Sequence, residues 1–144
     1  MLNRSYRGQD CSIARALEIV GERWTLLIVR DVFLGLQRFD QLQASLGIAR
    51  NVLTGRLRRL VDEGILERRR YSRHPARYEY RLTEKGNELI LALAALQQWG
   101  DKHVSEKPPR VLRRKRDKKR VVAALVARDG EVLLHDELEL APTV

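Results

Sequence analysis

The sequence contains a single cysteine, Cys11, among its 144 residues. One thiol forms no disulfide within the chain and supplies at most one ligand to a metal site. The three histidines, His74, His103 and His135, lie far apart and lack metal-site spacing to cysteines or carboxylates. We therefore expect neither a metal site nor a cofactor.

Long apolar runs and catalytic motifs are also missing. Every apolar run is far shorter than the roughly 18 residues of a membrane-spanning helix, and no export signal opens the chain. The sequence offers no Ser/His/Asp arrangement, no phosphate-binding glycine-rich loop and no paired carboxylates for acid–base chemistry. These absences predict a cytoplasmic protein with no membrane partner and no enzymatic activity.

What the sequence does have is positive charge, with 28 Lys and Arg against 19 Asp and Glu, a net of +9. Residues 50–81 hold 10 basic and 4 acidic groups, and residues 105–120 hold 9 and 2. The last stretch, 121–144, is acidic, with one basic and five acidic groups. Two basic segments of this kind indicate a polyanionic partner.

Apolar spacing predicts four consecutive helices. They cover residues 12–20, 22–34, 39–46 and 49–63, with Ser12 as the first N-cap and glycines ending each helix. Two β-like runs follow at 65–70 and 77–82 around a polar tip that contains His74 and Pro75. A last long helix is expected to begin at Thr83 and Glu84.

This order predicts a mainly α fold with a small β-hairpin (α+β), a winged helix-turn-helix. Helices 39–46 and 49–63 are joined by the short turn Gly47–Ile48, as a helix-turn-helix requires. The second helix of such a pair enters the major groove of double-stranded DNA, which is about 12 Å wide. A charged outer face on one helix alone is more often only solvated. Here the short turn, a basic face and a basic hairpin occur together, which favours DNA binding.

The polar face of helix 49–63 supplies the candidate base-reading and phosphate-binding side chains. They are Arg50, Asn51, Thr54, Arg58 and Arg59. Asn pairs bidentately with adenine and Arg with guanine, while the last two arginines are better placed for phosphates. The candidate wing residues on the hairpin are Arg69, Arg70, Arg73, His74 and Arg77. Arginines there are typical of a wing on the DNA backbone or in the minor groove.

The helix after Thr83 has more apolar surface than a domain of this size can cover. Its apolar side consists of Leu89, Ile90, Leu93, Leu96 and Trp99. We expect this side to form a homodimer interface. A two-fold dimer would place two recognition helices about 34 Å apart on a palindromic operator.

Several short motifs resemble the HxlR-type winged helix-turn-helix transcriptional regulators over about residues 9–103. They are the Cys11 opening, Gly21-Glu22-Arg23-Trp24, Arg38-Phe39, the run 51–60, Gly64-Ile65-Leu66, the wing 71–80, and Leu82-Thr83-Glu84-Lys85-Gly86. The resemblance implies a homodimeric, sequence-specific DNA-binding regulator of the bacterial cytoplasm, related in fold to MarR-type proteins. It carries groove roles to Arg50, Asn51, Thr54 and Arg58, and wing roles to Arg73 and Arg77. The predicted function is a transcriptional regulator acting as a repressor.

The chain departs from this family pattern after about residue 104. We expect a winged helix-turn-helix and dimerisation domain at 1–104, a basic linker or arm at 105–120, and a tail at 121–144. A turn at Asp129-Gly130 between two apolar runs predicts a hairpin in that tail. The tail could join the dimer, cover a ligand or remain unfolded. The arm at 110–120 also supports an alternative function, a non-specific nucleic-acid-binding protein.

Some HxlR-type regulators are similar in carrying a redox-sensing cysteine just before the first helix, where Cys11 lies. Arg15, one turn further on, and the helix N-terminus would both favour the reactive thiolate. The alternative is a buried and inert cysteine, which is common for free thiols.

Overall fold

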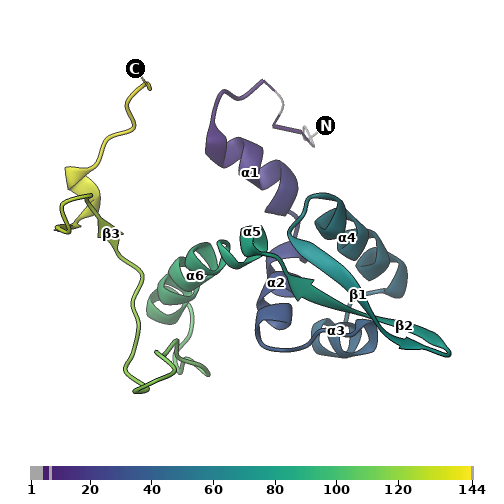
Figure 1. The fold of residues 1–144 in the computed structure, drawn as a ribbon. Coiled ribbons are helices and arrows are strands. Elements are labelled where there is room, and N and C mark those ends of the chain that lie inside the picture. Colours follow the sequence, from purple (N-terminus) through teal and green to yellow (C-terminus); the bar gives the residue numbers. More distant parts are fainter. Residues whose placement is uncertain (1–4, 7, 144) are drawn as a thin grey trace. The chain divides into compact units, whose positions relative to one another are not determined.

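The computed structural model describes residues 5–6 and 8–143, and the chain divides into two compact units, residues 1–90 and 91–144. Figure 1 shows the chain coloured from its N-terminal to its C-terminal end. The division falls at the start of helix α6 (Ile90–His103). The sequence predicted a domain boundary later, after residue 104. Each unit is therefore described by itself.

The first unit opens with four helices, α1 (Ser12–Val20), α2 (Thr25–Phe33), α3 (Phe39–Leu46) and α4 (Arg50–Asp62) (Figure 1). The predicted bounds of α3 are confirmed, and those of α4 differ by one residue at each end. Two predictions were wrong. Cys11, and not Ser12, is the N-cap of α1, and α2 begins at Thr25 because residues 22–24 form a turn. Apolar spacing alone does not separate a helix from the turn that leads into it.

The core of this unit forms where α2, α3 and α4 meet. Its fully buried side chains include Ile28, Val29, Leu42, Leu53, Leu57 and Leu60. The last three recur at helical spacing along α4, so one side of that helix is apolar and sealed. The α2 helix also packs against the second strand of the hairpin, and α4 against the first. This packing fixes the direction in which the other side of α4 faces.

A buried charge connects α2 to α3. Asp31 is 1% exposed, and its Oδ2 accepts a hydrogen bond from Ser45 Oγ at 2.6 Å. Its Oδ1 accepts from Arg30 Nε at 2.8 Å. Burial of a carboxylate is costly unless such partners surround it, so the cluster holds α3 at a defined position on α2.

The hairpin pairs β1 (Leu66–Arg73) with β2 (Ala76–Leu82) in antiparallel register, from Leu66 opposite Leu82 to Arg73 opposite Ala76. A bulge between residues 70 and 72 interrupts the ladder, and the His74–Pro75 peptide at the tip is cis. Both strands reach closer to the tip than the sequence predicted. Tyr78, Tyr80 and Leu82 are half-buried, in agreement with the predicted apolar face.

The single long helix predicted after Thr83 is instead two helices, a short α5 (Glu84–Asn87) and then α6. Thr83 caps α5 by accepting a hydrogen bond from Gly86 N at 3.1 Å, and its hydroxyl donates to Gly64 O at 2.5 Å. A Cβ on Gly86 would lie 2.2 Å from Ile65 O. The junction is therefore a close backbone approach, which apolar periodicity alone does not reveal.

The second unit contains the rest of α6 and a hairpin of two very short strands, β3 (Leu125–Val126) and β4 (Val132–Leu133). Gly130, in the turn between them, has a φ of 96°, as the sequence predicted for a glycine turn. A 3-10 turn, His135–Glu137, follows. Among the described residues no helix is both long and apolar enough to span a membrane.

Candidate nucleic-acid interface

The turn between α3 and α4 sets the geometry of the helix-turn-helix. Gly47 ends α3 in the left-handed conformation, with a φ of 63° that favours glycine. Ile48 is then buried, and Gln43 Nε2 donates to its carbonyl at 3.5 Å. Ala49 is extended and begins α4. One αL glycine and one buried isoleucine thus produce the short turn that the sequence predicted.

The outer face of α4 lies opposite its buried leucines. Asn51 and Arg58 are seven positions apart, so they fall near one line along a helix of about 3.6 residues per turn. That line runs close to the middle of this outer face. Gly55, between them, has no heavy atom within 4 Å of where its Cβ would be. All five candidate α4 residues are exposed. The structure thus places all five side chains at the surface of the protein.

The five candidate residues of α4 differ in the contacts that their side chains make within the protein. The guanidinium of Arg50 lies over the ring of Phe39, 4.8 Å from its centroid, and Thr54 Oγ1 donates to Arg50 O at 2.9 Å. Arg59 forms an ion pair with Glu63 at 3.2 Å. Asn51 and Arg58 have no side-chain contact of this kind with residues 5–6 or 8–143. These two side chains are the ones most available to an external ligand.

The candidate wing residues also differ in whether their side chains have a partner within the protein. Arg69 forms an ion pair with Glu67 at 2.8 Å, and Arg70 lies 6.0 Å from the ring centroid of Tyr78. The three residues nearest the tip are exposed and have no polar or aromatic partner within the described part of the chain. They are Arg73, His74 and Arg77. The tip of the wing therefore presents two arginines and a histidine to solvent.

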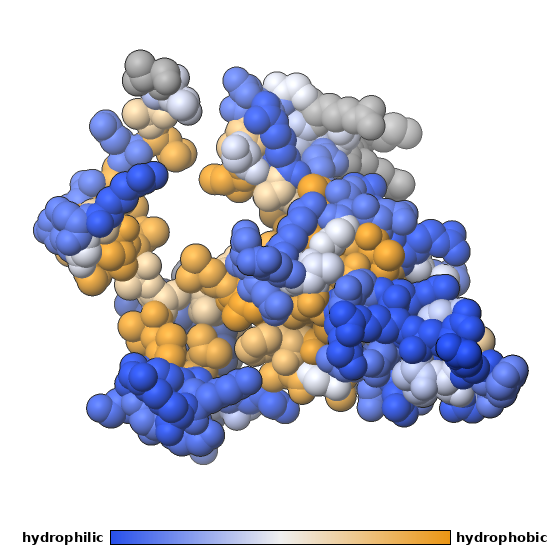
Figure 2. Space-filling model, viewed as in Figure 1, coloured by the Kyte–Doolittle hydropathy of each residue, from blue (hydrophilic) through white to orange (hydrophobic). Residues whose placement is uncertain are grey.

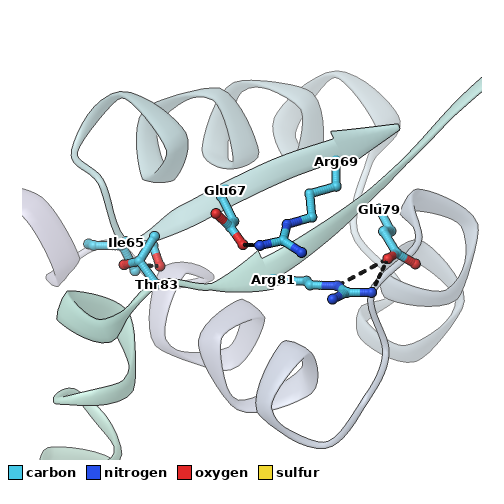
Figure 3. A network of polar contacts seen from close by, with 6 residues as sticks. All are labelled: Ile65, Glu67, Arg69, Glu79, Arg81 and Thr83. Atoms are coloured by element: carbon cyan, nitrogen blue, oxygen red, sulfur yellow. Dashed lines mark hydrogen bonds and ion pairs between the residues drawn. The ribbon is translucent and has the colours of Figure 1, made fainter. Parts of the chain in front are cut away.

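Two arginines towards the base of the wing, Arg69 and Arg81, are paired with acidic residues of the wing itself. Glu67 lies opposite Arg81 in the register and Arg69 opposite Glu79, so charge alternates along and across the ladder. Figure 3 shows the ion pairs within each strand, Glu67 with Arg69 and Glu79 with Arg81. Cross-strand neighbours of opposite charge also favour this register. Among the described residues, the hairpin arginines left without an acidic partner are Arg68, Arg70, Arg73 and Arg77.

A contact that the sequence did not reveal ties the wing to the helix-turn-helix. Tyr80 N donates to Gln37 O at 2.7 Å, which joins β2 to the segment before α3. Next to it, the guanidinium of Arg38 lies over the ring of Tyr71, 4.2 Å from the centroid. The Arg38-Phe39 pair was visible as a motif, but nothing in the sequence indicated its partner. These contacts hold the wing at a defined angle to α3.

Cys11 is half-buried at the N-terminus of α1. Arg15, one turn further on, forms an exposed ion pair in which its Nη2 donates to Asp10 Oδ1 at 2.7 Å. Among the residues described, no group of three His, Cys, Asp or Glu side chains could hold a metal ion.

The predicted dimer residues are not equally covered. Leu89, Ile90 and Leu93 are half-buried, whereas Leu96 is 55% and Trp99 61% exposed. The Trp99 ring lies 5.3 Å from that of His103, one turn further on. Large apolar side chains exposed at helical spacing are typical of a surface that is covered in the assembled protein.

Figure 2 shows hydrophilic surface gathered over the region of α4 and the β1–β2 hairpin, seen from the same side as in Figure 1. This agrees with the exposed arginines on those elements. A polar, cationic surface on a helix and an adjoining wing has the chemistry to bind phosphates and to hydrogen-bond base edges.

Comparison with known proteins identifies the same region. Residues 19–108 match the family model of the HxlR-like helix-turn-helix. The HTH-type transcriptional regulator Rv3095 of Mycobacterium tuberculosis is 52% identical over 111 residues, which cover 76% of this chain and 70% of that protein.

Two solved structures extend the comparison. The crystal structure of PA1607, described as a candidate transcription factor, is 34% identical and superposes with a TM-score of 0.84 over 94% of this chain and 97% of its own. That coverage continues beyond residue 104, where the sequence alone resembled no named family. The redox regulator HypR in its reduced form is 28% identical, with a TM-score of 0.61 over 64% of this chain and 92% of its own.

The predicted winged helix-turn-helix fold is confirmed by this likeness and by the order of the elements. The sequence match covers the helix-turn-helix, the wing and α6. The chain therefore belongs to the HxlR-like helix-turn-helix family of transcriptional regulators, which are DNA-binding proteins and not enzymes.

Proposed function

We propose that this regulator is a cytoplasmic, bacterial repressor that binds a palindromic operator as a homodimer. In each protomer α4 enters the major groove, and the tip of the wing lies on the backbone or in the minor groove. One observation carries this proposal. Asn51 and Arg58, near the middle of the outer face of α4, are exposed and have no side-chain partner among the described residues, while the opposite face is sealed by buried leucines.

We assign a role to each residue from the hydrogen-bonding and charged groups that its side chain has available for DNA. Asn51 has both an amide donor and an acceptor free, so it suits an adenine edge. Arg50, Thr54, Arg58 and Arg59 surround it and provide guanine and phosphate contacts. At the wing, Arg73, His74 and Arg77 carry the phosphate contacts, with Arg69 and Arg70 supporting them closer to the base.

Selection of bound duplexes from a random DNA library tests this proposal directly. We expect an enriched, two-fold symmetric sequence whose half-sites are about 34 Å apart, or one helical turn. The selected site should bind at least about 10³-fold more tightly than random duplex. Enrichment of no sequence would contradict the operator proposal. Such a result would favour the alternative of a non-specific nucleic-acid-binding protein using residues 110–120.

The homodimer gives a separate prediction at α6. Replacement of Leu96 by glutamate should shift the protein from dimer to monomer in sedimentation experiments at micromolar concentration, because it places a charge in an apolar interface. Leu91→Glu is the matched control. Leu91 is 69% exposed but lies on the other side of α6 from the proposed interface. A monomeric unmodified protein, or equal effects of both variants, would contradict this interface.

We also propose that Cys11 makes DNA binding responsive to oxidants or electrophiles. Its support is its place at the N-terminus of α1 and the likeness of the chain to the redox regulator HypR. Diamide should lower the operator affinity of the unmodified protein and leave that of Cys11→Ser unchanged. Cys11 is the only cysteine in the chain, so the serine variant removes every thiol. Equal responses of the two proteins to diamide would refute the proposal.

A further inference from the structure

Residues 112–121, here called the basic hairpin loop, follow α6 in the second unit. The loop holds seven basic side chains, Arg113, Arg114, Lys115, Arg116, Lys118, Lys119 and Arg120, against one acidic side chain, Asp117. It lies outside the helix-turn-helix and the wing. Figure 1 shows it in the green part of the chain that follows α6, and Figure 2 shows hydrophilic surface there.

Two prolines and a charge run predicted an extended linker or a solvated arm here, and the structure shows an exposed segment with backbone hydrogen bonds of its own. Arg113 and Arg120 form an antiparallel bridge, and Val121 N donates to Leu112 O at 3.0 Å. Within it, Arg114 N donates to Lys119 O at 2.9 Å, and Lys118 N donates to Arg114 O at 2.8 Å. These backbone bonds reverse the chain and fix the spacing of its cations.

Both flanks of the loop are fastened to α6 by neighbouring glutamines. Gln98 uses its whole amide on one residue, with Nε2 donating to Ala123 O at 3.0 Å and Oε1 accepting from Ala123 N at 2.9 Å. Gln97 Nε2 donates to Arg110 O at 3.1 Å on the other flank. A surface fixed in this way loses less conformational entropy on binding than a free arm would.

Most of the basic side chains of the loop have no acidic partner among the described residues. Arg114 pairs with Asp117, with its Nε 3.0 Å from Oδ1, and it holds the pKa of that carboxyl below its usual range. The other six cations have no side-chain partner in the described part of the chain. The acidic side chains beyond residue 121 do not neutralise them, since none of those described forms an ion pair with the loop. These six exposed side chains, held on a short loop that reverses the chain direction, either bind an anionic ligand or remain solvated.

We propose that the basic hairpin loop is a second DNA-binding surface, which contacts the sugar–phosphate backbone of the duplex without reading its sequence. The inference rests on the proposed function, because it assumes that the protein acts on duplex DNA. Duplex DNA presents one charge about every 1.7 Å along its axis, so a fixed row of cations releases several counterions on contact. The loop adds affinity to the complex, while α4 supplies the choice of site.

The test compares two double variants of the full-length protein with equal loss of charge. Lys115→Ala/Arg116→Ala removes two cations at the tip of the loop, and Lys107→Ala/Arg128→Ala removes two elsewhere in the second unit. Affinity is measured from 0.15 M to 1 M salt on the selected operator and on a random duplex. The loop variant should reduce the slope of log affinity against log salt by about 1.8, or about 0.9 per lost contact. Its deficit relative to the unmodified protein then grows about 30-fold between 1 M and 0.15 M salt.

The reduction in slope should be the same on both duplexes, so the ratio of operator to random affinity is unchanged. The control pair should leave the slope as it is, and the charge-conserving variant Lys115→Arg/Arg116→Lys should restore it. An unchanged slope in the loop variant overturns the inference, as does an equal change in the control pair. Loss of self-association in the loop variant overturns it as well, since the loop would then bind a second copy. Failure of the unmodified protein to prefer any operator would instead overturn the proposed function, and the random duplex would still test the loop.

Discussion

Replacement of Asn51 by alanine is expected to cost about 1–3 kcal/mol of operator affinity and almost nothing on random duplex. Asn51 is exposed on the outer face of α4, and its amide has no partner in the part of the chain that the structure describes. Its donor and acceptor are therefore available for one base edge. A truncated side chain leaves that edge unpaired. Binding measured on the selected operator, and on operators altered one base pair at a time, should show relaxed preference at a single position in each half-site.

The wing variant Arg73→Ala provides the contrast, because it removes a cation and no base-reading group. It should weaken binding to operator and random duplex by the same factor and reduce the salt slope by about one contact. The stability of each variant in urea separates lost recognition from lost folding. If Asn51→Ala and Arg73→Ala lower all affinities alike, α4 is not the element that reads the sequence.

The second large effect is expected at Gly86, which should tolerate no side chain. A Cβ there would lie 2.2 Å from Ile65 O and 3.0 Å from a methyl carbon of Leu82. Relief requires α5 to move away from Ile65, the residue before β1, which breaks the hydrogen bonds between Thr83 and the carbonyls of Gly64 and Ile65. We expect Gly86→Ala to lower the free energy of unfolding by about 1–3 kcal/mol, the range for overpacked sites.

Gly55→Ala is the matched control for this steric argument. Gly55 is exposed within α4, and nothing lies within 4 Å of the site of its Cβ. Alanine there should raise the free energy of unfolding by about 0.5–1 kcal/mol, because it gains helix propensity without a clash. Urea denaturation of the two variants and the unmodified protein measures both changes in the free energy of unfolding, the expected decrease for Gly86→Ala and the expected increase for Gly55→Ala. Equal or higher stability of Gly86→Ala would show that the junction can adjust at no cost.

Local sequence signals were sufficient wherever one segment specifies its own conformation. The αL glycine at Gly47 and the leucine spacing of α4 predicted the helix-turn-helix and the outward face that carries Asn51. The turn at Gly130 predicted the second hairpin in the same way. The signals were weaker at element ends. Apolar side chains in turns share the spacing of those in helices, which is why α2 was predicted to begin too early and why α5 and α6 were predicted as one helix.

The partners of charged side chains could not be read from the sequence. Ten basic residues between 50 and 81 looked equivalent there. An ion pair within β1 joins Arg69 to Glu67, and the fold places Arg38 over the ring of Tyr71. Arg73, at the tip, has no such side-chain partner in the described part of the chain. The ion pair of Arg15 with Asp10 was likewise not visible in the sequence. Long flexible side chains reach several neighbours, and only the fold decides which neighbour is near.

The sequence by itself determined that this protein is a basic winged helix-turn-helix with one candidate reading helix, because periodicity, glycines and charge act locally along the chain. The tertiary structure alone decided three further features. They are the burial of Asp31 against Ser45, the contact of Tyr80 with Gln37 that sets the wing, and the fastening of the basic hairpin loop by Gln97 and Gln98. Each joins segments far enough apart in the chain that their meeting depends on the folded path between them. A local pattern carries no record of that path.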